Sequence, residues 1–553
     1  MRIYILLPAL VVLSLLIVIP FPRTVSAAPP RPGIVTLTQP DGSKFQARVW
    51  GDEHAHGMET LDGYTIMLDP QTSYWVYAVR SASGVLIPAM GPQGKLVVGK
   101  SGPTALSKFA RPASPLRKAA VSRTVARANT GTRKVLVILA QFTDQSAVGT
   151  DATFWSDLFF GATNSVTSYY EQVSYNQLSF SAAEESDGIT NDGVVGWLTV
   201  PDAHPGTSFN DQFVADAINA ADSSVDFAAF DTNNDGYISV DELHIVAIAA
   251  GYEYAYVVSG SCGNSIWAHE NAFDDSTAPS VDGVQVGAGS HDGGYTTFGE
   301  WHCDSGEPPP GHPATIGIVV HELGHDLGLP DLYDTTGVTA GIGDWSIMGT
   351  GVWNSSGTYA GDSPAHPDPW SRWYEGWLTP MQVTGSLPGT NIPQIETSPT
   401  VYQLLPNPNG VDWLWGSHTG IGEYFLVENR QKTLYDTGIP GCGILVWHID
   451  ESVASNNNAD HRLVDLEQAD GLRELNIGAG GNSGDAGDPY PGTTVNLTFD
   501  AASSPSSALY SGSASYASVA HIDDCSSIIS ADLAYLPPAA YWYYFPVIGK
   551  QAP

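Results

Sequence analysis

Two histidines near the middle of the chain have a spacing that suits metal binding. His321 and His325 are four residues apart, so on a helix both imidazoles lie on one face and can bind one metal ion. Glu322 follows the first histidine and can take a proton from a water molecule on that metal. A chance match on a core helix is the alternative. The apolar run at 316–320 argues against it, because it indicates that the helix is buried. Burying the two histidines and Glu322 without a metal would leave their polar groups unpaired.

The residues after this pair offer a third ligand. Gly328 follows His325 by three positions, where a helix can end in the left-handed turn that glycine adopts at little cost. The chain can then double back and bring Asp331 to the metal. Glu375 is the alternative third ligand and would make the site thermolysin-like. Met348, in a glycine-ended turn, favours a metzincin-like arrangement with a Met-turn beneath the zinc, although methionine alone is a common core filler.

These residues predict a zinc endopeptidase that acts on proteins or peptides. His321, His325 and Asp331 would bind Zn²⁺ and leave one position for water. Glu322 would take a proton from that water and deliver it to the leaving amine. The alternative is a catalytically inactive, calcium-stabilised adhesin or surface-binding protein on the same fold. Such a protein would explain the acidic composition but would have little reason to keep Glu322.

An acidic segment at 231–242 matches the twelve-position loop that binds calcium. Oxygen-bearing side chains stand at the positions that such loops use, and Gly236 stands at the sharp turn. A strand-like run follows at 243–248, so we expect a structural Ca²⁺ site and not a sensor. A solvated Asp/Asn turn is the alternative. The expected ligands are Asp231, Asn233, Asp235, Tyr237 (through its peptide carbonyl), Ser239 and Glu242.

The first 27 residues predict a secretory signal peptide. A basic start, an apolar run at 3–19 and a small-residue site fit the pattern, with cleavage after Ala27 or Ala28. The apolar part of the tail at 539–553 is too short to span a bilayer. We therefore predict a secreted, extracellular protein with no stable membrane span.

Secretion also permits disulfide bonds between the four cysteines. Three pairings are possible, and the order of the domains favours Cys262 with Cys303 and Cys442 with Cys525. Free buried thiols are the alternative.

The chain is strongly acidic, with 58 acidic and 22 basic residues and a formal net charge of −36. Such a charge makes a poor nucleic-acid binder. It suits a protein that stays soluble outside the cell and binds calcium. The oligomeric state is not predicted.

Charge and pattern divide the chain into regions of an α+β multidomain protein. Residues 34–98 alternate as short strands separated by Asp-Gly and Ser-Gly turns. The segment 100–134 is basic and rich in Ser, Gly and Pro, which is typical of an exposed linker or of a site of maturation cleavage. A buried strand is expected at 134–140. After Pro380 short strands follow without a long helix, which favours a β-sandwich.

The expected helices lie around 154–170, 211–221 and, for the helix with the histidine pair, 314–327. We assign a signal peptide (1–27), a β-rich pro-domain (28–99), a basic linker (100–133), a metzincin-like α/β catalytic domain (134–380), a C-terminal β-sandwich-like domain (381–538) and an aromatic tail (539–553).

Several short stretches together resemble the secreted bacterial metallopeptidases of the immune inhibitor A family. Besides the zinc helix, the calcium-type loop and the Met-turn, they lie at 51–54, 62–64, 169–171, 174–175, 267–269, 330–334, 376–378, 428–430, 448–450 and 469–471. The resemblance implies a pro-domain, a metzincin-like catalytic domain and a C-terminal β-rich domain. It does not indicate which proteins are cut.

A secreted protease must be kept inactive before export. One way is for a residue of the pro-domain to bind the zinc at its open position. The first cysteine is Cys262, so no thiolate from the pro-segment can serve. Asp52 stands in a Gly-Asp pair similar to the aspartate switch of astacin-like metzincins, and a cut between Lys100 and Lys134 would release it. An ordinary Gly-Asp turn is the alternative.

Overall fold

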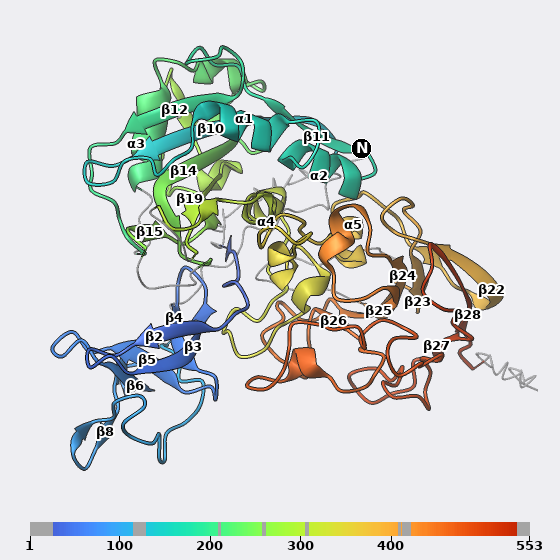
Figure 1. The fold of residues 1–553 in the computed structure, drawn as a ribbon. Coiled ribbons are helices and arrows are strands. Elements are labelled where there is room, and N and C mark those ends of the chain that lie inside the picture. Colours follow the sequence, from blue (N-terminus) through green and yellow to red (C-terminus); the bar gives the residue numbers. More distant parts are fainter. Residues whose placement is uncertain are drawn as a thin grey trace, which may run out of the picture.

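The computed structural model describes residues 26–113, 129–207, 212–256, 262–304, 309–407, 411 and 422–538. Nearly all of the expected signal peptide, residues 114–128 of the basic linker and the aromatic tail lie outside the described residues. The protein is multidomain, with mixed sheets and few helices. Figure 1 shows a small β-domain (blue), a central α/β part (cyan to yellow) and a C-terminal β-rich part (orange to red).

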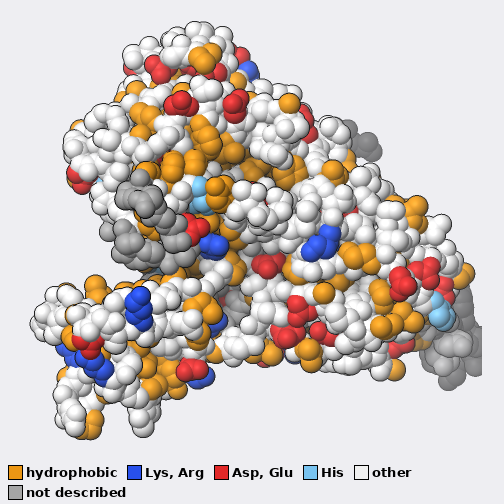
Figure 2. Space-filling view, viewed as in Figure 1, with side chains coloured by type: hydrophobic (Ala, Val, Ile, Leu, Met, Phe, Trp, Pro, Cys, Tyr) orange, Lys and Arg blue, Asp and Glu red, His pale blue; other side chains and the backbone are white. Residues whose placement is uncertain are grey.

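The N-terminal β-domain is an antiparallel sheet whose strands follow one another in chain order. Its tight turns place Gly42 and Gly63 at positive φ, which explains the Asp-Gly signals of the sequence. Figure 2 shows that Lys and Arg side chains gather on this domain, on the face shown. The strands are β2 (Val35–Thr38), β3 (Lys44–Gly51), β4 (His56–Thr60), β5 (Thr65–Leu68), β6 (Trp75–Arg80) and β7 (Leu86–Pro88), with β8 (Met90–Gly91) paired to β9 (Gly94–Lys95).

Residues 101–113 differ from the expected exposed linker, because they pack against the N-terminal β-domain. The backbone N–H of Phe109 donates to the carbonyl of Gly63. Arg111 forms an ion pair with buried Glu59 at 2.8 Å and stacks over the Trp50 ring. The buried partner and the aromatic ring hold this basic residue, and a composition-based prediction of a linker cannot detect such long-range contacts.

The central part is built on a mainly parallel sheet. β10 contains the buried run at 135–140 and begins at Gly131, slightly before the predicted start. Two strands at one edge, β16 and β1, run antiparallel to their neighbours. The members are β1 (Ser26–Ala27), β10 (Gly131–Gln141), β11 (Leu178–Ala182), β12 (Val194–Thr199), β14 (His244–Glu253), β15 (Ser265–Ile266), β16 (His269–Asn271), β19 (Tyr295–His302) and β20 (His312–Pro313).

The described residues contain five α-helices and several short 3₁₀ turns. The helical pattern at 154–170 splits in two, because Gly161 ends the first helix and Ser165 caps the second with a capping box. The helices are α1 (Ala152–Phe160), α2 (Val166–Val173), α3 (Gln212–Ala221), α4 (Ile316–Leu327) and α5 (Pro369–Tyr374), and the 3₁₀ turns are η1 (Phe227–Phe230), η2 (Gly289–His291), η3 (Gly343–Trp345), η4 (Thr350–Trp353), η5 (Leu434–Gly438) and η6 (Glu474–Asn476). Among the described residues no helix is long and apolar enough to cross a membrane.

The C-terminal part contains two sheets that share one hydrophobic core with the central part. Buried residues of β24 and β25 belong to the same cluster as those of α4 and β10, so the core runs on across the expected boundary at 380. One sheet has the order β21 (Met381–Gln382), β23 (Tyr402–Leu404), β24 (Glu423–Arg430), β25 (Gly443–Asp450) and β26 (Val464–Leu466); the other has β22 (Gly385–Pro393), β28 (Ile528–Tyr535) and β27 (Ala517–Ala520). A separate small sheet joins β13 (Tyr237–Ile238), which lies within the acidic loop, to β18 (Val284–Val286) and β17 (Ser280–Val281).

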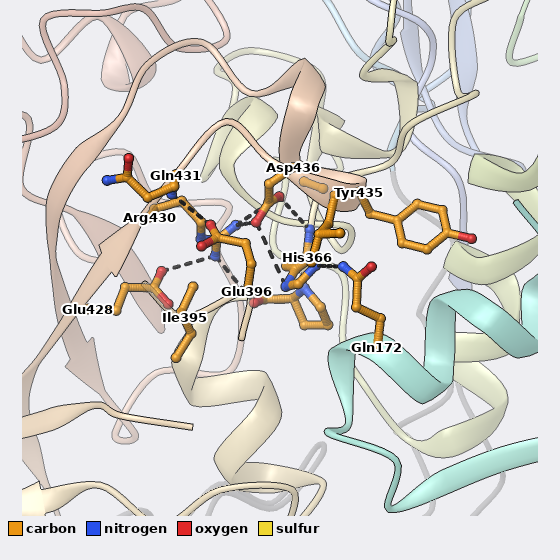
Figure 3. Close-up of polar contacts among 12 residues, drawn as sticks. Gln172, His366, Ile395, Glu396, Glu428, Arg430, Gln431, Tyr435 and Asp436 are labelled. Carbon is orange, nitrogen blue, oxygen red and sulfur yellow. Dashed lines mark hydrogen bonds and ion pairs between the residues drawn. The ribbon is translucent and has the colours of Figure 1, made fainter. Parts of the chain in front are cut away.

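A buried charge network ties the C-terminal part to the central part (Figure 3). The guanidinium of Arg430 on β24 lies 2.9 Å from a carboxylate oxygen of Glu428 and 3.2 Å from one of Asp436. The same guanidinium donates to the carbonyls of Trp345 and Pro367, each at 3.3 Å. Trp345 lies three residues before Met348, so the C-terminal sheet contacts the backbone that leads into the predicted Met-turn.

Both predicted disulfide bonds are present. Cys262 pairs with Cys303 in the central part, and Cys442 pairs with Cys525 in the C-terminal part.

Candidate metal and catalytic site

The helix α4 carries the histidine pair through the middle of the protein. Every one of its residues, Ile316–Leu327, is buried. It ends at Gly328, whose φ of 114° is left-handed as predicted, and the N–H of Leu329 donates to the carbonyl of Gly324. The turn sends the chain back along the helix, which brings Asp331 to the histidines.

The structure brings three potential ligand atoms together at this point. The Nε2 atoms of His321 and His325 are 3.1 Å apart. Asp331 Oδ1 lies 3.5 Å from the first and 3.2 Å from the second. Among the described residues, these three form one of the groups whose geometry could hold a metal ion.

The hydrogen bonds on the far side of each ring set the direction of its lone pair. His321 Nδ1 lies 2.7 Å from the carbonyl oxygen of Ile347, and His325 Nδ1 lies 2.8 Å from that of Leu329. A carbonyl only accepts, so each Nδ1 carries the proton and each Nε2 of a neutral imidazole presents its lone pair. Histidines that bind metals usually donate the N–H of their other ring nitrogen to such an acceptor, which fixes the orientation of the ring.

The arrangement fits a bound cation. Two nitrogen lone pairs and a carboxylate oxygen face one another, and Asp331 Oδ1 is buried without a hydrogen-bond donor. Burial acts to raise the pKa of Asp331, but the neighbouring His325 and His321 hold it well below its usual range. Burial likewise acts to lower the pKa of His325, and the charge of Asp331 outweighs it. Two imidazoles and one carboxylate suit zinc.

Glu322 lies beside this group in a desolvated position. Burial raises its pKa well above the usual range, and the charges of Asp331, Glu53 and Glu253 add to the effect. Its Oε1 accepts a hydrogen bond from the backbone N–H of Ala28 at 2.8 Å. A buried glutamate with a raised pKa can accept a proton and return it, as a general base and acid do.

Met348 lies beneath the helix, between η3 and η4. A Cβ atom on Gly324 would lie 3.0 Å from its sulfur, so the glycine lets the turn approach α4 closely. The N–H of Leu332 donates to the Met348 carbonyl at 2.8 Å. The methionine therefore packs against the helix and supports the segment that carries Asp331.

The N-terminal segment enters this site, which the sequence did not predict. β1 pairs antiparallel with β16, with Ala27 opposite His269. The Tyr333 hydroxyl donates to the carbonyl of Ala27 at 2.7 Å, and the Trp267 indole donates to the carbonyl of Ala28 at 2.9 Å. The sequence pattern at Ala27 and Ala28 indicates only a cleavage site. Tyr333 follows Asp331 by two residues, and this position in the sequence is the signal that could have indicated its place at the site.

Two other predicted residues lie apart from the three ligand atoms. The Glu375 carboxylate is buried and accepts from the side-chain amide of Asn129. Asp52 Oδ1 accepts from the backbone N–H groups of His54 and Ala55 at 3.0 and 2.9 Å, the geometry of a Gly-Asp turn. Its role in latency stays a prediction.

The acidic loop at 231–242 is closed by its own side chains. Glu242 accepts from the backbone N–H of Thr232 through one carboxylate oxygen and from that of Ser239 through the other. Asp231 accepts from the N–H of Gly236, whose φ is 87°. The loop has the expected sharp turn, and calcium binding stays a prediction.

Comparison with known proteins finds a family similarity in the part of the chain that carries the site. Residues 170–378 match the family described as Immune inhibitor A peptidase M6, catalytic domain. Immune inhibitor A of Bacillus thuringiensis subsp. alesti is 32% identical over 219 residues, which cover 34% of this chain and 30% of that protein. The Pre-pro-metalloprotease PrtV of Vibrio cholerae serotype O1 (strain M66-2) is 31% identical over 250 residues, 40% of this chain and 25% of that protein.

The similarity therefore spans less than a third of the length of each relative. It includes α4 and the turn with Met348, where the candidate ligands and Glu322 lie. Residues 170–378 are therefore similar to the catalytic domain of the immune inhibitor A family of M6 peptidases.

Proposed function

We propose that this protein is a secreted, zinc-dependent endopeptidase of the metzincin-like type. The observation that carries the proposal is the convergence of His321, His325 and Asp331 beside buried Glu322. The metalloprotease named among the relatives supports the same reaction class. The substrates would be extracellular proteins or peptides.

The three ligand side chains would hold the metal. Bound zinc supplies Lewis-acid chemistry to a water molecule and to a peptide carbonyl group. The carbonyls of Ile347 and Leu329 hold the two rings in the tautomer that binding requires. Met348 supports the chain at Leu332, next to Asp331.

Glu322 would move the proton. It accepts a proton from the attacking water and delivers it to the nitrogen of the leaving amine. The contact between Glu322 Oε1 and the N–H of Ala28 supports this role, because it shows that a peptide nitrogen fits within hydrogen-bonding distance of the carboxylate.

The surrounding parts would restrain and stabilise the enzyme. The N-terminal β-domain would act as a pro-domain, with Asp52 as the candidate latency residue and release by a cut between residues 100 and 134. It contacts the segment after Asp331, because Arg111 donates to the carbonyls of Thr336 and Gly337. The loop at 231–242 would bind one structural calcium ion.

A casein digestion assay on the secreted protein, combined with metal analysis, tests the proposal. Zinc bound to the protein and digestion that a zinc chelator stops and added zinc restores are the expected results. Zinc-free protein that digests casein equally well in the chelator would contradict it. Bound zinc with no digestion, even after limited proteolysis within residues 100–134, would favour the inactive binding protein.

A further inference from the structure

The chain itself shows how an extended peptide lies against the candidate site. β1 adds to the sheet beside β16, with Ser26 opposite Glu270 and Ala27 opposite His269. Beyond the strand, the indole of Trp353 donates to the carbonyl of Pro29 at 2.9 Å. Main-chain pairing to a sheet edge binds a peptide without requiring particular side chains.

One peptide bond of this segment faces the candidate catalytic residues with both of its polar groups. The carbonyl oxygen of Ala27 lies 3.4 Å from His321 Nε2 and 2.7 Å from the Tyr333 hydroxyl. The N–H of Ala28 lies 2.8 Å from Glu322 Oε1. Hydrolysis needs this orientation, with the carbonyl toward the ligand group and the nitrogen toward the proton donor.

We infer that Tyr333 is a further catalytic residue, which donates a hydrogen bond to the oxygen of the carbonyl group under attack. The inference rests on the proposed function. The water oxygen bonds to the carbonyl carbon, and the π pair of the C=O bond moves onto the oxygen that Tyr333 contacts. Glu322 takes a proton from the water and gives it to the nitrogen. The pair on the oxygen then re-forms the C=O bond as the C–N bond breaks and its electrons stay on the nitrogen, which leaves a carboxylic acid and an amine. Tyr333 keeps its proton throughout.

The backbone around Tyr333 is held in place before any substrate arrives. The N–H of Leu332 donates to Met348, and the N–H of Ile342 donates back to Leu332 at 3.1 Å. Gly341 has a φ of 64°, and a Cβ atom there would lie 2.4 Å from the Tyr333 Cα, so the two segments pack closely. A donor that is fixed in a water-excluded site stabilises developing charge more than a mobile one.

Tyr333→Phe tests the inference, because it removes only the hydroxyl. With zinc content unchanged, we expect kcat on a peptide containing Ser-Ala-Ala-Pro to fall on the order of 10²-fold, with KM within a few-fold. Tyr169→Phe is the matched control, since the Tyr169 hydroxyl also donates to a buried carbonyl, that of Ala365, at 2.7 Å. This control should keep the wild-type kcat.

A binding measurement separates catalysis from simple anchoring of the peptide. A phosphonamidate analogue of the same peptide carries a tetrahedral anionic centre in place of the attacked carbonyl. Tyr333→Phe should weaken its Kd by a factor similar to the loss in kcat, while the Kd of the intact peptide, measured in a Glu322→Gln background, changes little. Equal weakening of both ligands, or an unchanged kcat, would overturn the inference.

These outcomes are distinct from a failure of the proposed function. If Glu322→Gln still cuts the peptide, the proposed function fails whatever Tyr333→Phe does. If the wild type cuts nothing, the binding comparison still decides whether Tyr333 recognises the tetrahedral centre.

Discussion

At the residue scale, the site depends on electrostatic balance in a buried position. His321, His325, Asp331 and Glu322 are all buried, so each polar atom there needs a partner. The two imidazoles find theirs in backbone carbonyls, while Asp331 Oδ1 and Glu322 Oε2 have no donor in the described part of the chain. A cation between the ligand atoms would be a partner for Asp331 Oδ1, and a water molecule beside Glu322 would be a partner for its Oε2.

Asp331→Asn tests the third ligand. The substitution keeps the size of the side chain but removes its charge, so bound zinc measured after dialysis should fall sharply. Glu375→Gln is the matched control, because this buried carboxylate lies against Asn129 and should not change the zinc content. Zinc retained in Asp331→Asn and lost in Glu375→Gln would instead favour the thermolysin-like arrangement.

At the element scale, the elements that form from local sequence match their predictions better than those held by long-range contacts. α4 ends at Leu327 as predicted, because Gly328 adopts the left-handed turn that the sequence indicates. The strand predicted at 134–140 lies within β10. β1 was not predicted, since its pairing with β16 joins residues far apart in the chain. The packing of 101–113 was missed for the same reason.

The C-terminal sheet contains a histidine whose charge depends on its sheet neighbours. Burial acts to lower the pKa of His448, but hydrogen bonds to Glu423 and Glu467 outweigh it and raise the pKa to about 9. Because the folded pKa lies above the unfolded value of about 6.5, the stabilisation is full below that pH. It is lost as the pH rises through about 9, by about 3 kcal/mol in total.

Thermal unfolding of His448→Gln measures this contribution. The wild type should lose stability between pH 6 and pH 9, and the variant should lose clearly less over the same interval. His521→Gln is the control, since the His521 side chain is 84% exposed and should leave the wild-type dependence intact. An undiminished loss in His448→Gln would contradict the assignment.

At the scale of the whole molecule, separate regions of the chain converge on one site. The N-terminal β-domain contacts the segment after Asp331 through Arg111, and the buried Arg430 network contacts the backbone that leads into the Met-turn from the C-terminal side. The grouping of the candidate metal ligands could be predicted because they lie within eleven residues of one another, 321–331. The hydrophobic core that is shared across residue 380 could not be predicted, because burial depends on the assembled fold.

Removing calcium tests whether an ion bound at the loop 231–242 stabilises the whole protein. An ion that binds only the folded state stabilises it, so removing calcium with a chelator that spares zinc should lower the unfolding temperature. Glu242→Gln should reproduce much of that loss, while Asp222→Asn, at an exposed position after α3, should not. An unfolding temperature that does not respond to calcium would show that the loop at 231–242 is only a turn.

The most direct measurement for the central claim combines casein digestion with zinc analysis of Glu322→Gln. The glutamine has nearly the same size as glutamate but cannot take a proton from water. The proposed mechanism predicts near-complete loss of digestion with wild-type zinc content, while the exposed-site variant Asp222→Asn keeps both. Digestion by Glu322→Gln at the wild-type rate, with zinc bound, would contradict the mechanism.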